Sequence, residues 1–240
     1  MLVKTEAIVL HTLKYGESKV IVDMFTRSLG RLAFIVPLPK SSKSRIKKQY
    51  FQPLTLLEIE CEVRPRVQLQ KLSDARILTP YVSIFLSPEK LAIGIFVAEF
   101  LYYSLRTEQR DEALFDYIAD SFLWLDMAEG GYANFHLTFL MRLSRFLGFY
   151  PNLNNYEEQS IFDLRNGCFS TQVPLHRDFL LPNEAKLILQ LMRMDFPTMH
   201  LFQLSRHDRH RIMDVLLLYY KQHLPDFPEM KSLAVLQQLW

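Results

Sequence analysis

The chain has 240 residues, 49% of them hydrophobic, and its 28 Lys and Arg against 26 Asp and Glu give a formal net charge of +2 at pH 7. This composition excludes a disordered chain, and two distant cysteines, Cys61 and Cys168, exclude a disulfide framework and suit a reducing cytoplasm. The most apolar window, residues 91–105, contains Glu99 and is shorter than the roughly 20 residues of a membrane span, so we expect no membrane segment.

Residues 1–80 have the pattern of short strands. In residues 55–63, three apolar side chains, Leu57, Ile59 and Cys61, alternate with glutamates, which is the period of a strand with one buried face. Gly-containing or Pro-containing turns separate the other β-branched or apolar runs, at residues 6–15, 18–26, 30–38 and 66–72. Five short strands without a crossover helix predict a five-stranded β-barrel of the OB-fold type.

Residues 81–240 have helical spacing. Ser87 is a typical N-cap, because Pro88 and Glu89 follow it in the first turn. We expect helices at residues 88–107, 111–127, 133–149, 183–194, 209–224 and 230–240. The fold class is therefore α+β with two domains. The first is an OB-fold barrel at 1–80, and the second is all-helical at 81–240 with an irregular insertion at 152–180.

Charge is divided unevenly between the predicted domains. Residues 1–80 hold 14 Lys and Arg against 7 Asp and Glu, a charge of +7, whereas residues 81–240 hold 14 against 19, a charge of −5. No acidic residue occurs from Met24 to Leu57. Residues 37–50, the basic segment, contain five cations, Lys40, Lys43, Arg45, Lys47 and Lys48. A solvated linker explains its serines but not the absence of acid, so we favour a phosphate-binding edge.

We therefore predict that the barrel binds nucleic acid through phosphates, with little sequence preference. Basic residues near two turns would widen the surface, so the predicted binding residues are Lys19, Arg27, Arg31, Lys40, Lys43, Arg45, Lys47 and Lys48. Tyr50 and Phe51 are candidates for stacking on a base or for the core, and we favour the core for Phe51. Phosphate neutralisation that leaves base edges free would allow complementary strands to pair.

The sequence gives no positive signal for catalysis, and we expect a protein that is not an enzyme. Glu58, Glu60 and Glu62 share one strand face, where solvated outward charge explains them. His207 and His210 lack a third metal ligand at a defined distance, and neighbouring arginines would repel a cation. The chain has no Cys-x-x-Cys pair, no phosphate-binding glycine loop and no G-x-S-x-G motif.

The order of the segments resembles the RecO family of bacterial recombination mediators. The resemblance is carried by residues 5–32, 43–45, 51–60, 139–153, 220–224 and 231–239. It implies an OB-fold followed by a helical domain, in a bacterial, nucleoid-associated protein. It also implies binding of single- and double-stranded DNA and annealing of complementary strands. With RecR, such proteins help to load RecA onto DNA coated by single-strand-binding protein (SSB).

Two departures from the family pattern affect the site. Many members carry four cysteines of a zinc site after the Leu-Gly-aromatic helix, whereas this chain keeps only Cys168 there, so we predict no zinc and no other cofactor. The family's usual Lys-Gly-Ala-Arg after the third strand is replaced here by Pro-Leu-Pro-Lys at residues 37–40. The positive charge is retained in the residues that follow directly.

Family members also bind the acidic, Phe-ending tail of SSB through the helical domain. Here the candidate residues of one helix are Phe139, Arg142, Arg145 and Phe146. The alternative is a helix whose arginines only face water. Three rival functions remain for the whole chain: an RNA-binding OB module, a helical interaction scaffold that binds protein, and a nuclease that uses Glu58, Glu60 and Glu62.

Overall fold

The computed structural model describes residues 2–37, 46–106 and 109–239, and the chain divides into two compact units. The first unit comprises residues 1–127 and 230–239, and the second comprises residues 128–229. By compactness, the barrel and the first two helices group together. The two domains expected at residues 1–80 and 81–240 are defined by strand and helix patterns in the sequence, not by compactness, and this boundary stays a prediction.

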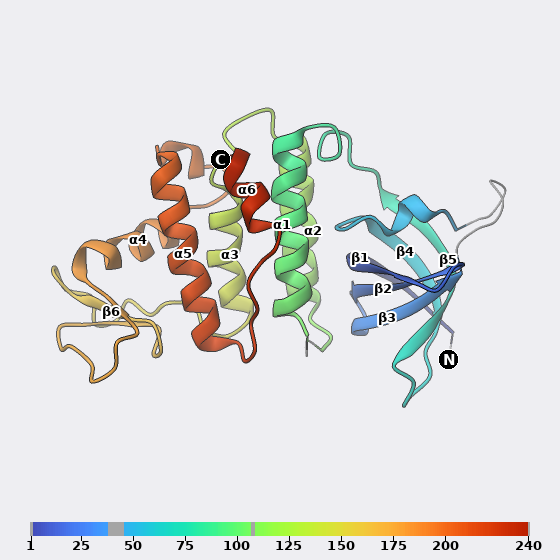
Figure 1. The fold of residues 1–240 in the computed structure, drawn as a ribbon, viewed down its shortest axis with the longest axis horizontal. Coiled ribbons are helices and arrows are strands. Elements are labelled where there is room, and N and C mark those ends of the chain that lie inside the picture. Colours follow the sequence, from blue (N-terminus) through green and yellow to red (C-terminus); the bar gives the residue numbers. More distant parts are fainter. Residues whose placement is uncertain (1, 38–45, 107–108, 240) are drawn as a thin grey trace. The chain divides into compact units, whose positions relative to one another are not determined.

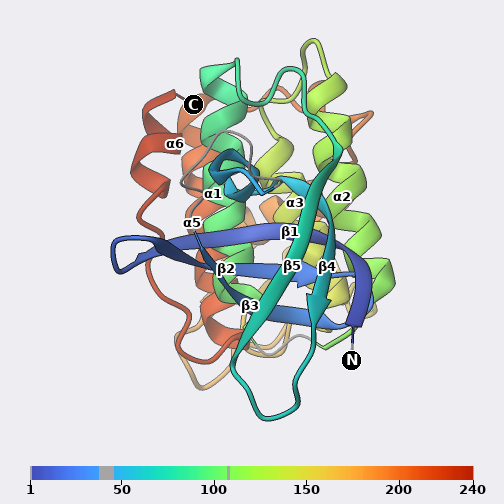
Figure 2. The same cartoon turned by 90° about the vertical axis from the view of Figure 1, so that its right-hand side faces the viewer.

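The N-terminal part of the first unit is a closed five-stranded barrel (Figures 1 and 2). Its strands are β1 (Leu2–Tyr15), β2 (Lys19–Thr26), β3 (Gly30–Pro37), β4 (Leu56–Glu62) and β5 (Leu69–Thr79). The order around the barrel is β1-β2-β3-β5-β4, with β3 and β5 parallel and the other neighbouring pairs antiparallel. The predicted five-stranded barrel of the OB type is confirmed.

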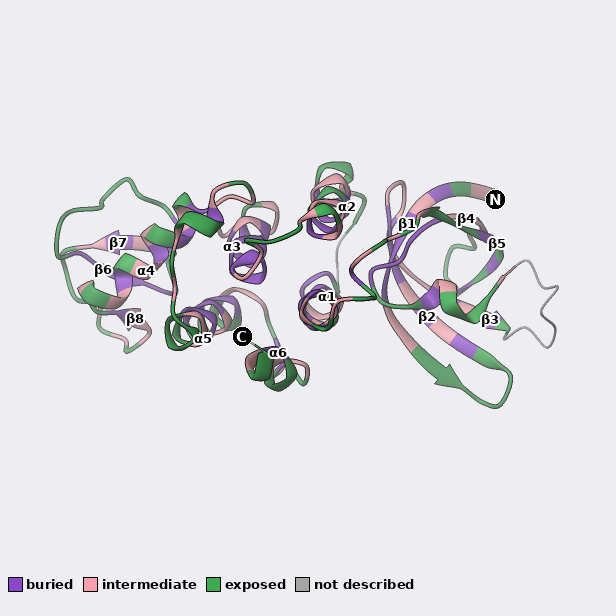
Figure 3. Ribbon diagram, turned by 90° about the horizontal axis from the view of Figure 1, so that it is seen from above, coloured by how far each residue is buried: buried purple, intermediate pink, exposed green. Residues whose placement is uncertain are grey.

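Side-chain alternation along the strands places the barrel core. Leu57, Ile59 and Cys61 of β4 are fully buried, and the glutamates between them point to the other face. Phe51, which precedes β4, is 3% exposed and belongs to the same core, as its position predicted. Figure 3 shows this pattern as buried stretches that alternate with intermediate and exposed ones along the barrel strands.

Three helices complete the first unit: α1 (Pro88–Ser104), α2 (Glu112–Met127) and the short α6 (Leu233–Leu239). Ser87 caps α1 by accepting a hydrogen bond from the Lys90 backbone N–H, as predicted. The Glu99 carboxylate of α1 accepts hydrogen bonds from the backbone N–H groups of Lys231 and Ser232, at 3.0 and 2.8 Å. These contacts fix the approach of the chain to α6.

A single carboxylate fixes the connection between the barrel and α1. Asp126, near the end of α2, accepts hydrogen bonds from the backbone N–H groups of residues 82, 83 and 84 at 2.7 to 2.9 Å. Burial disfavours its charge, but these hydrogen bonds outweigh burial and lower the pKa of Asp126. The buried Lys90 ammonium donates to the Asp126 backbone carbonyl at 3.0 Å.

The second unit combines helices with a small sheet. Its helices are α3 (Phe135–Phe146), α4 (Pro182–Arg193), the 3-10 helix η2 (Met199–Leu201) and α5 (Arg206–His223). The stretch expected to be irregular contains the antiparallel strands β6 (Ile161–Asp163), β7 (Cys168–Ser170) and β8 (Phe179–Leu180), in the order β7-β6-β8. Among the described residues of both units, no helix is long and apolar enough to cross a membrane.

Candidate nucleic-acid interface

The C-terminal part of the basic segment leads into a short helix at one end of the barrel. Lys47 is extended and immediately precedes the 3-10 helix η1 (Lys48–Phe51). Tyr50 is partly buried against the barrel core, whereas Lys47 and Lys48 are exposed. The other three predicted cations of the segment, Lys40, Lys43 and Arg45, lie outside the described residues.

Hydrogen bonds hold η1 and the turn after it against β1. The Thr12 hydroxyl donates to the Phe51 backbone carbonyl at 2.7 Å. The Leu54 backbone N–H donates to the Val9 carbonyl at 2.6 Å, and the Val9 N–H donates to the Thr55 carbonyl at 3.1 Å. Together with the buried ring of Phe51, these bonds fix the position from which Lys47 and Lys48 reach solvent.

Lys19 lies at the point where the chain leaves β3 for the basic segment. It opens β2 and is paired in register with Tyr15 of β1 and with Pro37 of β3. Its side chain is exposed. None of the ion pairs among the described residues engages Lys19, Lys47 or Lys48.

Two further predicted binding residues are engaged inside the first unit. Arg27 forms ion pairs with Glu6 of β1, at 2.8 Å, and with Asp116 of α2. Its guanidinium also lies 5.1 Å from the centre of the Phe115 ring. Arg31 pairs with Asp23 at 3.1 Å, and only 13% of its side chain is exposed. Arg27 thereby joins the barrel to α2, and Arg31 joins it to α1 by donating to the Tyr102 backbone carbonyl. Among the predicted cations that the structure describes, Lys19, Lys47 and Lys48 are the exposed ones without an ion pair.

A groove of about 450 Å³ adjoins η1, and we call it the η1 groove. It is lined mainly by apolar surface, from Thr12, Val20, Lys48, Gln49, Phe51, Gln52 and Pro53. Lys48 lines the groove from η1, whereas Lys19, which precedes the lining residue Val20 in β2, is exposed outside the lining. The sequence did not reveal this groove, because its walls are 28 or more residues apart.

Two of the three glutamates of β4, Glu58 and Glu62, are engaged by cations. Glu58 pairs with Lys4 at 2.9 Å and with Arg76 at 2.6 Å, and Glu62 pairs with Arg64 at 2.8 Å. Hydrogen bonds, first from Arg76 and then from Lys4, lower the pKa of Glu58. A carboxylate held by two cations is poorly suited to act as a base or as a metal ligand, so the position of Glu58 does not support the nuclease alternative.

The four residues proposed for the tail pocket do not form one surface. Phe139 is fully buried, and the Arg142 guanidinium donates to the Met194 backbone carbonyl at 3.1 and 2.9 Å. Arg145 is exposed and lies 4.5 Å from the centre of the Tyr150 ring, and Phe146 is partly buried. Of the four side chains, only Arg145 reaches an open groove.

That groove, the α4 groove, has a volume of about 440 Å³. It combines two arginines with tyrosines and aliphatic side chains, namely Arg145, Tyr150, Leu153, Tyr156, Leu189, Met192 and Arg193. Leu189 and Arg193 are four residues apart in α4, so they share one face of that helix. The sequence reasoning missed them because it considered α3 alone, whereas the groove arises where α4 packs on α3.

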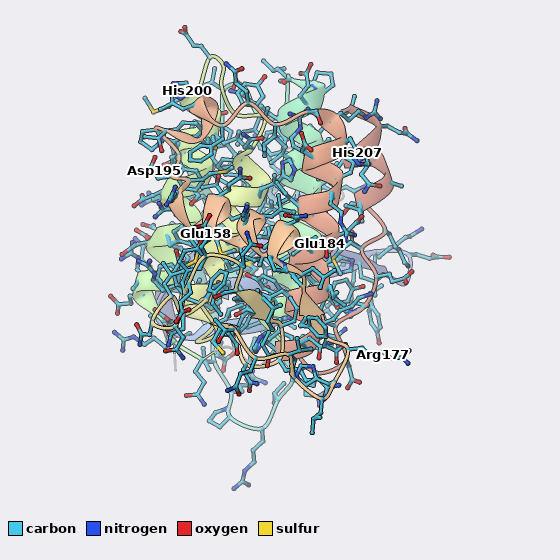
Figure 4. The ribbon with its side chains drawn as sticks, turned by 90° about the vertical axis from the view of Figure 1, so that its left-hand side faces the viewer. Glu158, Arg177, Glu184, Asp195, His200 and His207 are labelled. Atoms are coloured by element: carbon cyan, nitrogen blue, oxygen red, sulfur yellow. The ribbon has the colours of Figure 1, made fainter. Side chains whose placement is uncertain are left out.

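The residues around Cys168 do not fit a zinc ion. Burial, followed by the nearby Asp163 carboxylate, raises the pKa of the Cys168 thiol and disfavours the thiolate that zinc binds. Among the described residues, no group of three His, Cys, Asp or Glu side chains is arranged to hold a metal ion. Figure 4 shows candidate ligands of the second unit lying apart from one another, namely Glu158, Glu184, Asp195, His200 and His207.

Comparison with known proteins assigns both the barrel part and the helical part of the chain to one family. The family model described as "Recombination protein O N terminal" matches residues 1–81, and "Recombination protein O C terminal" matches residues 86–233. Proteins named DNA repair protein RecO are similar over their full lengths and that of this chain, with 48% identity in Bacteroides fragilis, 48% in Phocaeicola vulgatus and 36% in Flavobacterium psychrophilum. The chain therefore belongs to the RecO (recombination protein O) family.

Proposed function

We propose that this chain is a DNA repair and recombination mediator that binds single- and double-stranded DNA through the phosphates and anneals complementary strands. With RecR, it assists the loading of RecA onto DNA coated by SSB, and it does so in the bacterial cytoplasm, at the nucleoid. It performs no catalysis and carries no zinc. Membership of the RecO family supports the repair role, since the relatives at 48% identity are named DNA repair proteins.

The observation that best supports the proposed DNA-binding site is the position of three exposed lysines. Lys19 opens β2 opposite Pro37, where β3 ends, and Lys47 and Lys48 lie at the start of η1, from which Lys48 lines the η1 groove. Lys40, Lys43 and Arg45 lie between these positions in sequence and add to the proposed surface. In this proposal Arg27 and Arg31 support the surface from within the unit instead of contacting phosphates.

The proposed annealing mechanism follows from a surface that carries positive charge but no motif for reading base edges. Lysines that neutralise phosphates lower the repulsion between two strands and leave the pairing edges of most bases free. Complementary strands that lie on one such surface therefore meet at high local concentration. Binding of this kind depends strongly on salt and little on sequence.

We propose that the α4 groove binds the acidic SSB tail. Arg145 and Arg193 supply positive charge at the groove, and Tyr150, Leu189 and Met192 supply the apolar surface that an aromatic end requires. This site replaces the set of four residues on α3 as the proposed tail pocket, because Phe139 and Arg142 are occupied within the unit.

An annealing assay tests the proposed function. Two complementary oligonucleotides should anneal faster with the protein than without it, and Lys47→Ala/Lys48→Ala should remove most of the acceleration. The matched control is Lys186→Ala/Lys221→Ala, which removes two exposed lysines of the second unit and should leave the acceleration intact. Equal loss in both double variants would refute the proposed surface. Preferential binding of RNA over DNA of the same sequence would favour the RNA-binding alternative.

A further inference from the structure

The η1 groove has an apolar floor that is set in place before any ligand arrives. Phe51 and Val20, which line it, are 3% and 4% exposed. The hydrogen bond from the Thr12 hydroxyl to the Phe51 carbonyl, 2.7 Å long, fixes η1 against β1 across the groove. The groove therefore keeps a fixed shape, and a ligand that enters it loses less free energy to reorganisation of its walls.

The exposed polar side chains of the groove are of two kinds. Gln49 and Gln52 are exposed and carry amides, each of which offers both donors and an acceptor. Lys48 is exposed and supplies a positive charge. An apolar slot with amides and one cation at its border matches a flat heterocycle that is linked to a phosphate.

We propose that the η1 groove receives one unpaired nucleobase of a bound single strand. The base lies against Pro53, above the small exposed edges of Phe51 and Val20, its edge meets the Gln49 and Gln52 amides, and its phosphate lies near Lys48. The groove volume, about 450 Å³, admits one base with its sugar, and amides that both donate and accept are compatible with any base. This inference rests on the proposed DNA binding and deepens it.

Occupation of the groove distinguishes a single strand from a duplex. A paired base has its edge engaged and stacks on its neighbours, so it enters only after it has been turned out of the helix, at a cost. One base held in the groove would fix the strand on the surface, and the remaining bases would stay available for pairing. Preference for single strands over duplexes is the expected consequence.

The test compares a thymidine oligonucleotide of about 15 nucleotides with an abasic strand of equal length and equal charge. The wild-type protein should bind the thymidine strand about tenfold more tightly, a difference of about 1.4 kcal/mol. Gln49→Ala/Gln52→Ala should reduce this preference to about twofold while leaving the affinity for the abasic strand unchanged. The matched control is Gln68→Ala, an exposed glutamine of the first unit that lies outside the groove lining.

Three results would overturn the inference. Equal wild-type affinity for both strands would show that no base is held, and DNA binding itself would stand. An equal loss of both affinities in Gln49→Ala/Gln52→Ala would assign η1 to phosphate contacts only. Phe85 lines a neighbouring groove. If Phe85→Ala abolished the preference for the thymidine strand, the base would lie in that groove instead. If the wild-type protein binds neither strand, the proposed function fails together with the inference.

Discussion

Arg31 lies over the ring of Tyr102, with its guanidinium carbon 4.6 Å from the ring centre, and donates a hydrogen bond to the backbone carbonyl of the same tyrosine. Arg31 belongs to β3 and Tyr102 to α1, so one side chain ties the barrel to the first helix. The contact combines a cation–π interaction with a charge-assisted hydrogen bond. A guanidinium used in this way is withdrawn from the surface that a phosphate would approach.

We expect Arg31→Ala to lower the free energy of unfolding by about 1.5–3 kcal/mol, because it removes hydrogen bonds of a charged, mostly buried group. The salt dependence of single-stranded DNA binding should not change. Urea denaturation and a salt titration of affinity provide the two measurements. If stability were unchanged and the log–log salt slope fell by about 0.7, Arg31 would be a phosphate contact after all.

Gly30 should tolerate no side chain. Its φ is +71°, and a Cβ atom there would lie 2.6 Å from the Gln109 carbonyl carbon, part of the backbone that leads into α2. We expect Gly30→Ala to cost about 2–4 kcal/mol, from left-handed strain and overpacking together. Gly16→Ala is the control, because Gly16 has a φ of +66° but open space around it, and should cost about 1 kcal/mol. Similar thermal stabilities of the two variants would contradict the close approach.

The sequence was sufficient for the barrel because its strands carry their burial pattern locally. Alternation of Leu57, Ile59 and Cys61 with glutamates depends only on neighbours along the chain, and the predicted strand at 55–63 corresponds to β4, Leu56–Glu62. The strands β6 and β8 are short, three and two residues, and have no comparable pattern. They form through pairing between positions distant in sequence, so single-segment reasoning treated the region as irregular.

His136 should make the protein less stable in mild acid. Burial, followed by the charges of Arg209 and His210, lowers the pKa of this α3 histidine to about 3. The unfolded chain takes up the proton near pH 6.5, well above the folded-state value. The contribution of neutral His136 to the free energy of unfolding is therefore complete above about pH 6.5. It is lost as the pH falls toward the folded-state pKa, by about 1.4 kcal/mol per pH unit.

Replacement of His136 by Gln should flatten this dependence between pH 6 and 4, as measured by urea denaturation across that range. His207→Gln, at an exposed position of α5, is the control substitution. A pH dependence that is equally steep in His136→Gln and in the wild-type protein would contradict the assignment to this buried histidine.

Arg145→Ala/Arg193→Ala should weaken the binding of intact SSB by about tenfold, since it removes both cations of the α4 groove. Arg177→Ala, an exposed arginine of the second unit labelled in Figure 4, is the control and should bind as the wild type does. Fluorescence anisotropy with labelled SSB provides the measurement. If SSB that lacks its tail bound as tightly as intact SSB, the tail would have no part in the contact.

The candidate site was less predictable than the fold because charge in a sequence does not reveal the partner of each cation. Arg27 and Arg31 occur in the same acid-free stretch as Lys47 and Lys48, but the carboxylates that engage Arg27 come from Glu6 and Asp116, far away in the chain. Ion pairing separates the two kinds of cation, and the carboxylates that pair with the arginines are brought to them by tertiary packing. For the same reason, the sequence could not show that β1, β2 and η1 enclose a groove.

The most direct test of the central claim is the affinity for single-stranded DNA as a function of salt, for the wild-type protein and for the variant with Lys43, Arg45, Lys47 and Lys48 changed to Ala. Each lost phosphate contact should lower the log–log slope by about 0.7, so the slope should fall by up to roughly 3 while affinity at low salt collapses. An unchanged slope and affinity would contradict the account, because the basic segment would then be a solvated linker and DNA would bind elsewhere.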